Sequence, residues 1–220
     1  MKKEENELKI KENFSLAFKN HKDKNYNLAK NYYNKVLEIN PNHFESIFLL
    51  GSLSVQNNNF NQAKDYYERA AKIKPDEANT FYNLGVVNTE LGDFMKAVTY
   101  YEKALTLRTN HANTYNNLGL VLSKLGHYKK AISFYEKAIK LEVNHANAYN
   151  NLGLAFKNLN DLNNAKNYYE KALSLEPNEK KFNSNYGELL LSLNHHKKGL
   201  EHIKIGSGFI NFTQENFEII

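Results

Sequence analysis

The chain has 220 residues, 41% hydrophobic and 24% charged, with a formal net charge of +5 and a pI near 9.0. It contains no cysteine, which excludes disulfide bonds, thiolate metal sites and cysteine nucleophiles. No run of about 18 apolar residues occurs, and the start MKKEENELKI lacks the apolar core of a secretory signal. These features predict a cytoplasmic protein without a membrane-spanning helix.

A period of 34 residues runs along nearly the whole chain without insertion. The stretches NHANTYNNLG (110–119) and NHANAYNNLG (144–153) differ at one position in ten. One position of the period holds a small residue: Ala17, Gly51, Gly85, Gly119, Gly153 and Gly187. Another holds tyrosine: Tyr33, Tyr67, Tyr101, Tyr135 and Tyr169. Such a period predicts an array in which each repeat buries its apolar face against its neighbours.

Each period contains two helical patterns. In residues 78–111, Phe81, Leu84 and Val87 have the spacing of one helix face, and Gly92 with the following aspartate breaks the pattern. The second helix is indicated by Phe94, Ala97, Tyr101 and Ala104. We expect the small residues to let the two helices approach closely and the tyrosines to fill the space between them.

Short polar residues precede both helices at fixed places, as N-terminal caps do. Those predicted to cap the first helices are Asn42, Asp76, Asn110, Asn144 and Asn178. Those predicted to cap the second helices are Asn25, Asn59, Asp93, His127, Asp161 and His195.

The pattern of Leu84-Gly85, Gly92, Ala97, Tyr101 and Ala104, together with the 34-residue period, resembles the tetratricopeptide repeat. The resemblance covers residues 10–206, in repeats that start near residues 10, 44, 78, 112, 146 and 180, the last of them degraded. It implies an all-α fold, a right-handed α-solenoid of about six helix-turn-helix repeats. It also implies a concave groove, lined by the first helices, that binds a peptide or a partner protein.

Both ends of the array (1–206) depart from the pattern. Asn13 stands where later repeats have an apolar residue, so we expect the first helix to begin earlier, near Glu5. The sixth repeat has His196 in a column that is otherwise aromatic. The tail 207–220, which contains SGFINFTQENFEII, is apolar. It is expected to cap the end of the array; docking a partner and leading into a catalytic domain are the alternatives.

Counting Ala78 as position 1, the resemblance implies that position 6 faces the groove. It holds an asparagine in four repeats: Asn83, Asn117, Asn151 and Asn185. An amide both donates and accepts hydrogen bonds, so such a row can hold the backbone of an extended peptide. The arrays of O-linked N-acetylglucosamine transferases are similar in this respect. The alternative is that the asparagines are an inherited consensus that serves helix packing.

Position 5 changes character along the chain. It holds Phe14, Phe48 and Tyr82 in the first three repeats, then Asn116 and Asn150. This pattern predicts a bipartite groove, with an apolar anchor site in repeats 1–3 and a track that grips peptide backbone in repeats 3–6. The alternative is that the aromatic residues pack against the neighbouring repeat.

Family members that hold the carboxylates of chaperone tails need a lysine at position 5 and an asparagine at position 9. Position 9 here holds Phe18, Ser52, Val86, Leu120, Leu154 and Glu188. No clamp for two carboxylates can therefore be assembled, which speaks against an adaptor for chaperone tails.

Lysine or arginine at one position of the second helix follows glutamate in most repeats, as in Glu102-Lys103. Alternating signs indicate a solvated face and speak against nucleic-acid binding. His43, His111 and His145 share one column, so they are spread along the array and predict no metal site. We expect no enzyme and no cofactor. The sequence predicts a scaffold that binds a protein or peptide; the alternative is a substrate-recruiting subunit of a separately encoded modifying enzyme, such as a glycosyltransferase. The oligomeric state stays open.

Overall fold

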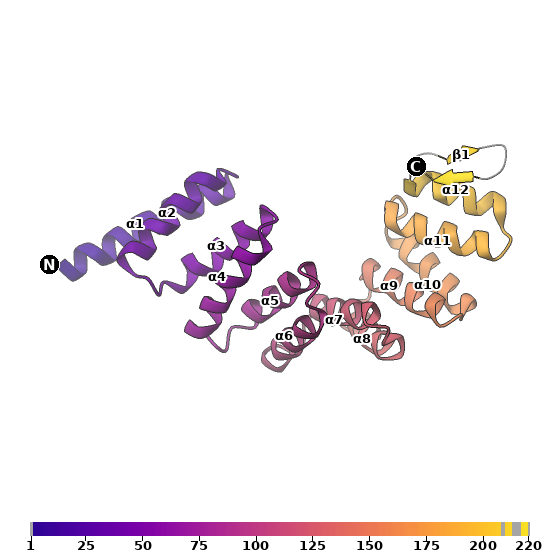
Figure 1. The fold of residues 1–220 in the computed structure, drawn as a ribbon, viewed down its shortest axis with the longest axis horizontal. Coiled ribbons are helices and arrows are strands. Elements are labelled where there is room, and N and C mark those ends of the chain that lie inside the picture. The colour runs from indigo at the N-terminus through magenta and orange to yellow at the C-terminus, as the bar shows by residue number, and fades with distance from the viewer. Residues whose placement is uncertain (1, 208–209, 213–216, 220) are drawn as a thin grey trace. The chain divides into compact units, whose positions relative to one another are not determined.

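The computed structural model of the chain describes residues 2–207, 210–212 and 217–219. Within these residues it forms twelve helices and two strands (Figure 1). The helices are α1 (Lys2–Lys22), α2 (Tyr26–Ile39), α3 (Phe44–Gln56), α4 (Phe60–Ile73), α5 (Ala78–Glu90), α6 (Phe94–Leu107), α7 (Ala112–Lys124), α8 (Tyr128–Leu141), α9 (Ala146–Asn158), α10 (Leu162–Leu175), α11 (Lys180–Ser192) and α12 (His196–Ser207). The strands are β1 (Ile210–Phe212) and β2 (Phe217–Ile219).

The helices belong to two compact parts, an N-terminal part (Met1–Thr109) with α1 to α6 and a C-terminal part (Asn110–Ile220) with α7 to α12. Within each part every helix packs on the next one along the chain. In the C-terminal part the first helices also contact one another, α7 with α9 and α9 with α11. Each part thus contains three stacked helix-turn-helix repeats. The predicted all-α fold, a solenoid of six such repeats, is confirmed.

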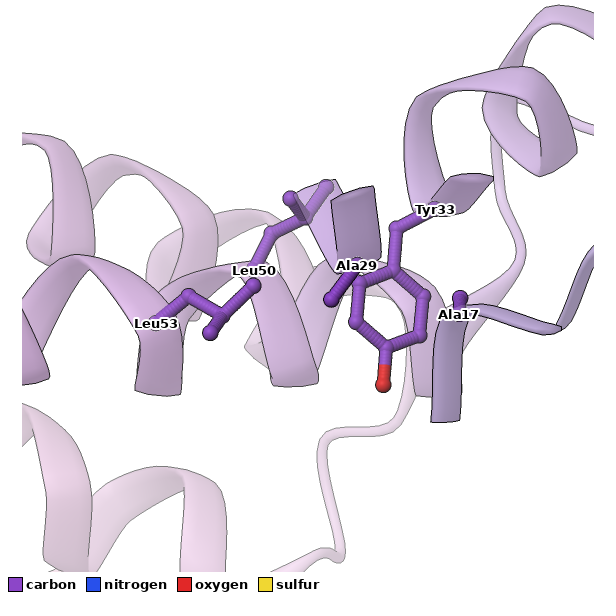
Figure 2. Packing of buried hydrophobic residues seen from close by; sticks show 5 residues of the cluster. All are labelled: Ala17, Ala29, Tyr33, Leu50 and Leu53. Carbon is purple, nitrogen blue, oxygen red and sulfur yellow. The ribbon is translucent and has the colours of Figure 1, made fainter. Parts of the chain in front are cut away.

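The tyrosine column forms the centre of each repeat. Tyr135 is 1% exposed, and a Cβ atom added to Gly119 would lie 2.7 Å from its Cε1 atom, which real Cβ atoms do not tolerate. In the first repeat the ring of Tyr33 lies between Ala17 and Ala29 (Figure 2). The small residues of the first helix therefore stand where the tyrosine ring of the second helix packs against it, as predicted.

The turn between the two helices of every repeat contains one residue with positive φ. These residues share one position of the period: Lys24, Asn58, Gly92, Gly126, Asn160 and Asn194. Glycine adopts this conformation without strain, and asparagine tolerates it better than most residues. The column explains why the break between helices is glycine or asparagine in five of the six repeats.

The caps of the first helices lie one residue later than predicted. The N-cap residues are His43, Glu77, His111, His145 and Glu179, not the residues before them (Asn42, Asp76, Asn110, Asn144, Asn178). Nδ1 of His43 accepts a hydrogen bond from Ser46 N at 3.3 Å, and Nδ1 of His145 accepts one from Ala148 N at 3.3 Å. The imidazole nitrogen thus accepts the capping hydrogen bond that the shorter amide side chain of the preceding asparagine was expected to accept.

The second helices begin where the sequence predicts. Asn59 accepts from Gln62 N at 3.3 Å and Asp161 from Asn164 N at 3.1 Å, as N-caps do. Asn25, Asp93 and His127 also occupy the N-cap position.

The structure tests the prediction for the first helix of the array but leaves that for the C-terminal tail open. Helix α1 already includes Lys2, which confirms the early start of the first helix. Strands β1 and β2 pair antiparallel, with Ile210 opposite Ile219. Half of the residues of the predicted apolar cap at 207–220 lie outside the described ones, and the cap stays a prediction. Among the residues described, no helix combines the length and apolar character needed to cross a membrane.

Candidate binding surface

In the N-terminal part the position-5 aromatic residues pack on the tyrosine of their own repeat. The ring centroids of Phe14 and Tyr33 lie 5.9 Å apart, those of Phe48 and Tyr67 5.5 Å, and those of Tyr82 and Tyr101 6.0 Å. The tyrosines are fully buried, whereas Phe14, Phe48 and Tyr82 are half-buried. Each first helix of this part therefore presents one aromatic side chain that is supported from below and keeps an exposed face.

Aromatic side chains at position 5 also contact residues of the neighbouring repeat. Phe14 lies 5.2 Å from the ring of His43, the N-cap of the next first helix, and Phe48 borders a cluster that includes Leu84 of repeat 3. The aromatic column thus packs within a repeat and between repeats at once. Phe18, one turn after Phe14, is 43% exposed, and Lys22 Nζ lies 4.9 Å from its ring centroid. Phe18, at position 9, is more accessible than the three position-5 aromatic side chains.

In the C-terminal part the asparagines of positions 5 and 6 bond to one another between repeats. Asn151 Nδ2 donates to Asn116 Oδ1 at 3.0 Å, and Asn185 Nδ2 donates to Asn150 Oδ1 at 2.9 Å. Within repeat 4, Asn116 Nδ2 donates to Asn117 Oδ1 at 3.2 Å. Position 6 of one repeat therefore donates to position 5 of the preceding repeat, and these bonds join α7 to α9 and α9 to α11.

Burial divides the predicted amide residues into two groups. Asn116, Asn150 and Asn151 are 7%, 0% and 4% exposed, so their side chains lie inside the contact between first helices. Asn117 and Asn185, and Asn83 on α5 of the N-terminal part, are half-buried and keep part of their surface. A buried amide in a hydrogen bond stabilises the stacking of repeats, because its loss would leave the partner amide unsatisfied. Peptide binding by the row stays a prediction, and its accessible members are the half-buried ones and the exposed Asn113 and Asn147.

The hydroxyl of the column tyrosine meets a polar side chain of its first helix in four repeats. Tyr33 lies 3.3 Å from His21 Nδ1, Tyr67 3.1 Å from Ser52 Oγ, Tyr101 3.4 Å from Thr89 Oγ1 and Tyr135 3.2 Å from Ser123 Oγ. Three of these partners stand at position 12. Burial raises the pKa of Tyr33, Tyr67 and Tyr135 to about 12. The hydroxyls therefore stay protonated at neutral pH.

The fifth repeat has a lysine at position 12. Nζ of Lys157 forms an ion pair with Glu188 Oε2 of α11 at 2.9 Å. Sequence reasoning missed this pair. The two residues are 31 positions apart and belong to different columns, so no single-column comparison could find them.

Two of the histidines lie beside asparagine side chains. His145 Nε2 lies 3.1 Å from Asn113 Oδ1 of the preceding repeat, and His202 Nδ1 lies 2.8 Å from Asn183 Oδ1. In the part of the chain that the structure describes, no group of three or more histidine and carboxylate side chains could hold a metal ion.

The charged column of the second helices lies against aromatic rings. Lys103 Nζ lies 5.8 Å from the ring centroid of Phe81, Lys137 5.0 Å from Phe134 and Lys171 6.0 Å from Tyr149. Lysines that cover rings of their own repeat stabilise the fold through cation–π contacts. This arrangement is structural, and it agrees with the interpretation of the column as an outer face.

Family models match the chain in four stretches. The description "tetratricopeptide repeat" applies to residues 21–84, 76–141 and 146–179, and "TPR repeat" applies to residues 124–160. Together they extend from the second helix of repeat 1 to the end of repeat 5. No curated protein sequence matches the chain.

Solved structures agree with the fold. The crystal structure of MamA protein is 28% identical, with a TM-score of 0.71, over 77% of this chain and 92% of that one. PilF of Pseudomonas aeruginosa is 18% identical, with a TM-score of 0.75, over 90% of both chains. YrrB, a TPR protein with an unusual peptide-binding site, is 22% identical, with a TM-score of 0.62, over 80% of this chain and 91% of its own. The 34-residue period, the six helix pairs and these matches together show that the chain belongs to the tetratricopeptide repeat family.

Proposed function

We propose that this protein-interaction scaffold binds an extended segment of a partner protein along its first helices. The observation that carries the proposal is the aromatic row of the N-terminal part, in which Phe14, Phe48 and Tyr82 rest on buried tyrosines and keep one face exposed. A rigidly supported aromatic ring loses little side-chain entropy on binding, and such anchors carry much of the energy of protein interfaces.

The C-terminal part offers a different chemistry. Its first helices carry the exposed Asn113 and Asn147 and the half-buried Asn117 and Asn185. Amides can both donate to and accept from a peptide backbone. The buried Asn116, Asn150 and Asn151 hold α7, α9 and α11 together by hydrogen bonds, so the accessible amides have fixed spacing. A preorganised row binds with a smaller entropic cost than flexible side chains would.

Replacing anchor residues tests the proposal. Phe48→Ser with Tyr82→Ser should weaken the binding of a captured partner by at least about tenfold, because both exposed ring faces are lost. The measurement is a titration of the purified partner by calorimetry, with circular dichroism to check helical content. Phe18→Ser should also weaken binding, and since Phe18 is 43% exposed, it should do so without loss of stability.

Met95→Ser is the matched control, because Met95 is an apolar residue that is 70% exposed on the second helix α6. It should leave the affinity unchanged. Equal affinity of the wild type and of Phe18→Ser, Phe48→Ser and Tyr82→Ser chains that keep their helical content would contradict the anchor role.

A further inference from the structure

The first helices of the N-terminal part end on residues whose charge changes from repeat to repeat. Position 13 holds Lys22 in α1, Gln56 in α3 and Glu90 in α5, and all three side chains are exposed. Neither Lys22 nor Glu90 forms an ion pair with another described residue. The edge formed by these helix ends is therefore positive at α1, neutral at α3 and negative at α5.

Position 13 lies on the same side of each first helix as the aromatic row. It follows position 9 by four residues and position 5 by eight, a spacing that brings side chains together along one helix face. The contacts in α1 show this directly. The ring centroids of Phe14 and Phe18 lie 6.3 Å apart, and Lys22 Nζ lies 4.9 Å from the ring centroid of Phe18. The charges of the edge thus border the apolar row that the proposed function uses.

The turns after the first helices do not reverse this trend. Residues 23–25 have no net charge, and residues 57–59 are asparagines. In the turn after α5, Asp93 lies 3.4 Å from Lys96, so that its charge is compensated. The edge therefore keeps its positive charge at α1 and its negative charge at α5.

The opposite edge, where the first helices begin, has no such change of sign. Position 2 there holds Lys11, Glu45 and Asn79. Glu45 lies 2.9 Å from Lys74, and Asn79 Oδ1 accepts a hydrogen bond from Arg108 at 3.1 Å. Only the edge at the helix ends can distinguish an acidic from a basic end of a bound segment.

The spacing of the two uncompensated charges suits an extended segment. Packed helices lie about 8–10 Å apart, so the two steps from α1 to α5 separate Lys22 from Glu90 by roughly 20 Å. An extended chain rises about 3.3 Å per residue, so two partner residues about six places apart span this distance. Alternate side chains of such a segment point to the same side. Apolar residues at the alternate places between the two charges would therefore face the aromatic row.

We propose that the N-terminal part binds its partner segment in one orientation, with an acidic residue of the segment on Lys22, a basic residue about six places away on Glu90, and alternating apolar residues between them on the aromatic row. This inference rests on the proposed function and names the charge pattern of the segment. Exposed ion pairs add little affinity. Their main effect is to fix the register and the orientation of the segment.

Three blocked peptides test the proposal on the full chain. The first is acetyl-Gly-Glu-Thr-Leu-Ser-Leu-Thr-Lys-Gly-amide, the second has the reversed sequence, and the third has Gln in place of both Glu and Lys. Binding is followed by the shifts of backbone amide signals in two-dimensional NMR spectra at about 20 mM salt, where exposed charges are weakly screened. One of the two charged peptides should bind at least about threefold more tightly than the neutral one, and it identifies the chain direction of the segment.

A nitroxide label on the preferred peptide measures its orientation. A label at the acidic end should broaden the signals of α1 more than those of α5, and a label at the basic end should do the opposite. The reverse pattern, or equal broadening of both helices by both labels, would overturn the proposal.

Two variants assign the preference to this edge. Lys22→Met and Glu90→Gln should each reduce the preference for the charged peptide, and the double variant should abolish it. Lys35→Met and Glu102→Gln are controls of the same charge change at exposed positions of the second helices α2 and α6. Lys35 is closely matched, since its Nζ lies 4.8 Å from the ring centroid of Tyr32. Both controls should leave the preference unchanged.

The outcomes separate this inference from the proposed function. If charged and neutral peptides bind equally and both lose affinity in Phe18→Ser, the anchor row stands and the charge pattern is wrong. If the preference survives in the double variant, it comes from charges elsewhere in the chain, and the inference is also wrong. If no peptide shifts any signal of the N-terminal part, the inference and the anchor role of this part are both contradicted.

Discussion

Raising the pH from 9 to 12 should unfold the helix array as the buried tyrosines lose their protons. Tyr33, Tyr67 and Tyr135 have pKa values of about 12 in the folded chain, because burial disfavours the charged phenolate, against 10.0 for an exposed tyrosine. Below pH 10 the hydroxyls are protonated in both states and the full stability is present. Between pH 10 and 12 the unfolded chain ionises first, so stability falls by about 2–3 kcal/mol for each tyrosine.

The measurement is a pair of titrations of the full chain, one by circular dichroism and one by the absorbance of tyrosinate. Loss of helix and ionisation of the buried tyrosines should coincide. Tyr135→Phe removes one titrating hydroxyl and keeps the ring, so its stability relative to the wild type should improve between pH 10 and 12. Unchanged helical content in a chain whose tyrosines have all ionised would contradict the buried column.

Tyr67→Ala should lower the free energy of unfolding by about 3–5 kcal/mol, as the loss of a large buried ring does. Tyr67 is 2% exposed and supports the ring of Phe48, and it lies so close to Gly51 that a Cβ atom added there would be 2.7 Å from its Cε1 atom. The variant leaves a cavity between α3 and α4 and removes the hydroxyl that lies 3.1 Å from Ser52 Oγ.

Urea unfolding followed by circular dichroism measures this effect. Asp65→Ala on the same helix is the control, since Asp65 is exposed, and it should change stability by less than about 0.5 kcal/mol. A loss as small as that of the control would mean that Tyr67 does not hold the repeat together.

The fold was predictable because the same packing problem is solved six times. A single glycine opposite a tyrosine is weak evidence, but Gly51, Gly85, Gly119 and Gly153 each meet a tyrosine 16 residues later. The helix starts were less predictable. His43 and His145 cap first helices through Nδ1, and the sequence offers a better-known capping residue directly before each of them.

For the candidate surface, the sequence could predict which columns of the repeat contribute to it, but not which of their residues are exposed. Sequence reasoning placed Asn150 and Asn151 on a peptide-facing row, and the structure buries both of them between first helices. Their burial depends on how closely consecutive first helices stack, which a column of one residue type does not encode. The bond from Asn185 to Asn150 and the Lys157–Glu188 pair each combine two columns of different repeats, so the stacking had to be known before either could be found.

Site-specific photo-crosslinking tests the central claim, that a partner segment lies along the first helices. A benzophenone amino acid is placed at Phe18 and Asn147 on the first helices α1 and α9, and at Met95 and Lys140 on the second helices α6 and α8. The captured protein and its crosslinked residues are identified by mass spectrometry. Crosslinks from both Phe18 and Asn147 to a single partner are the predicted result. Crosslinks to that partner from Met95 and Lys140 alone would contradict the account.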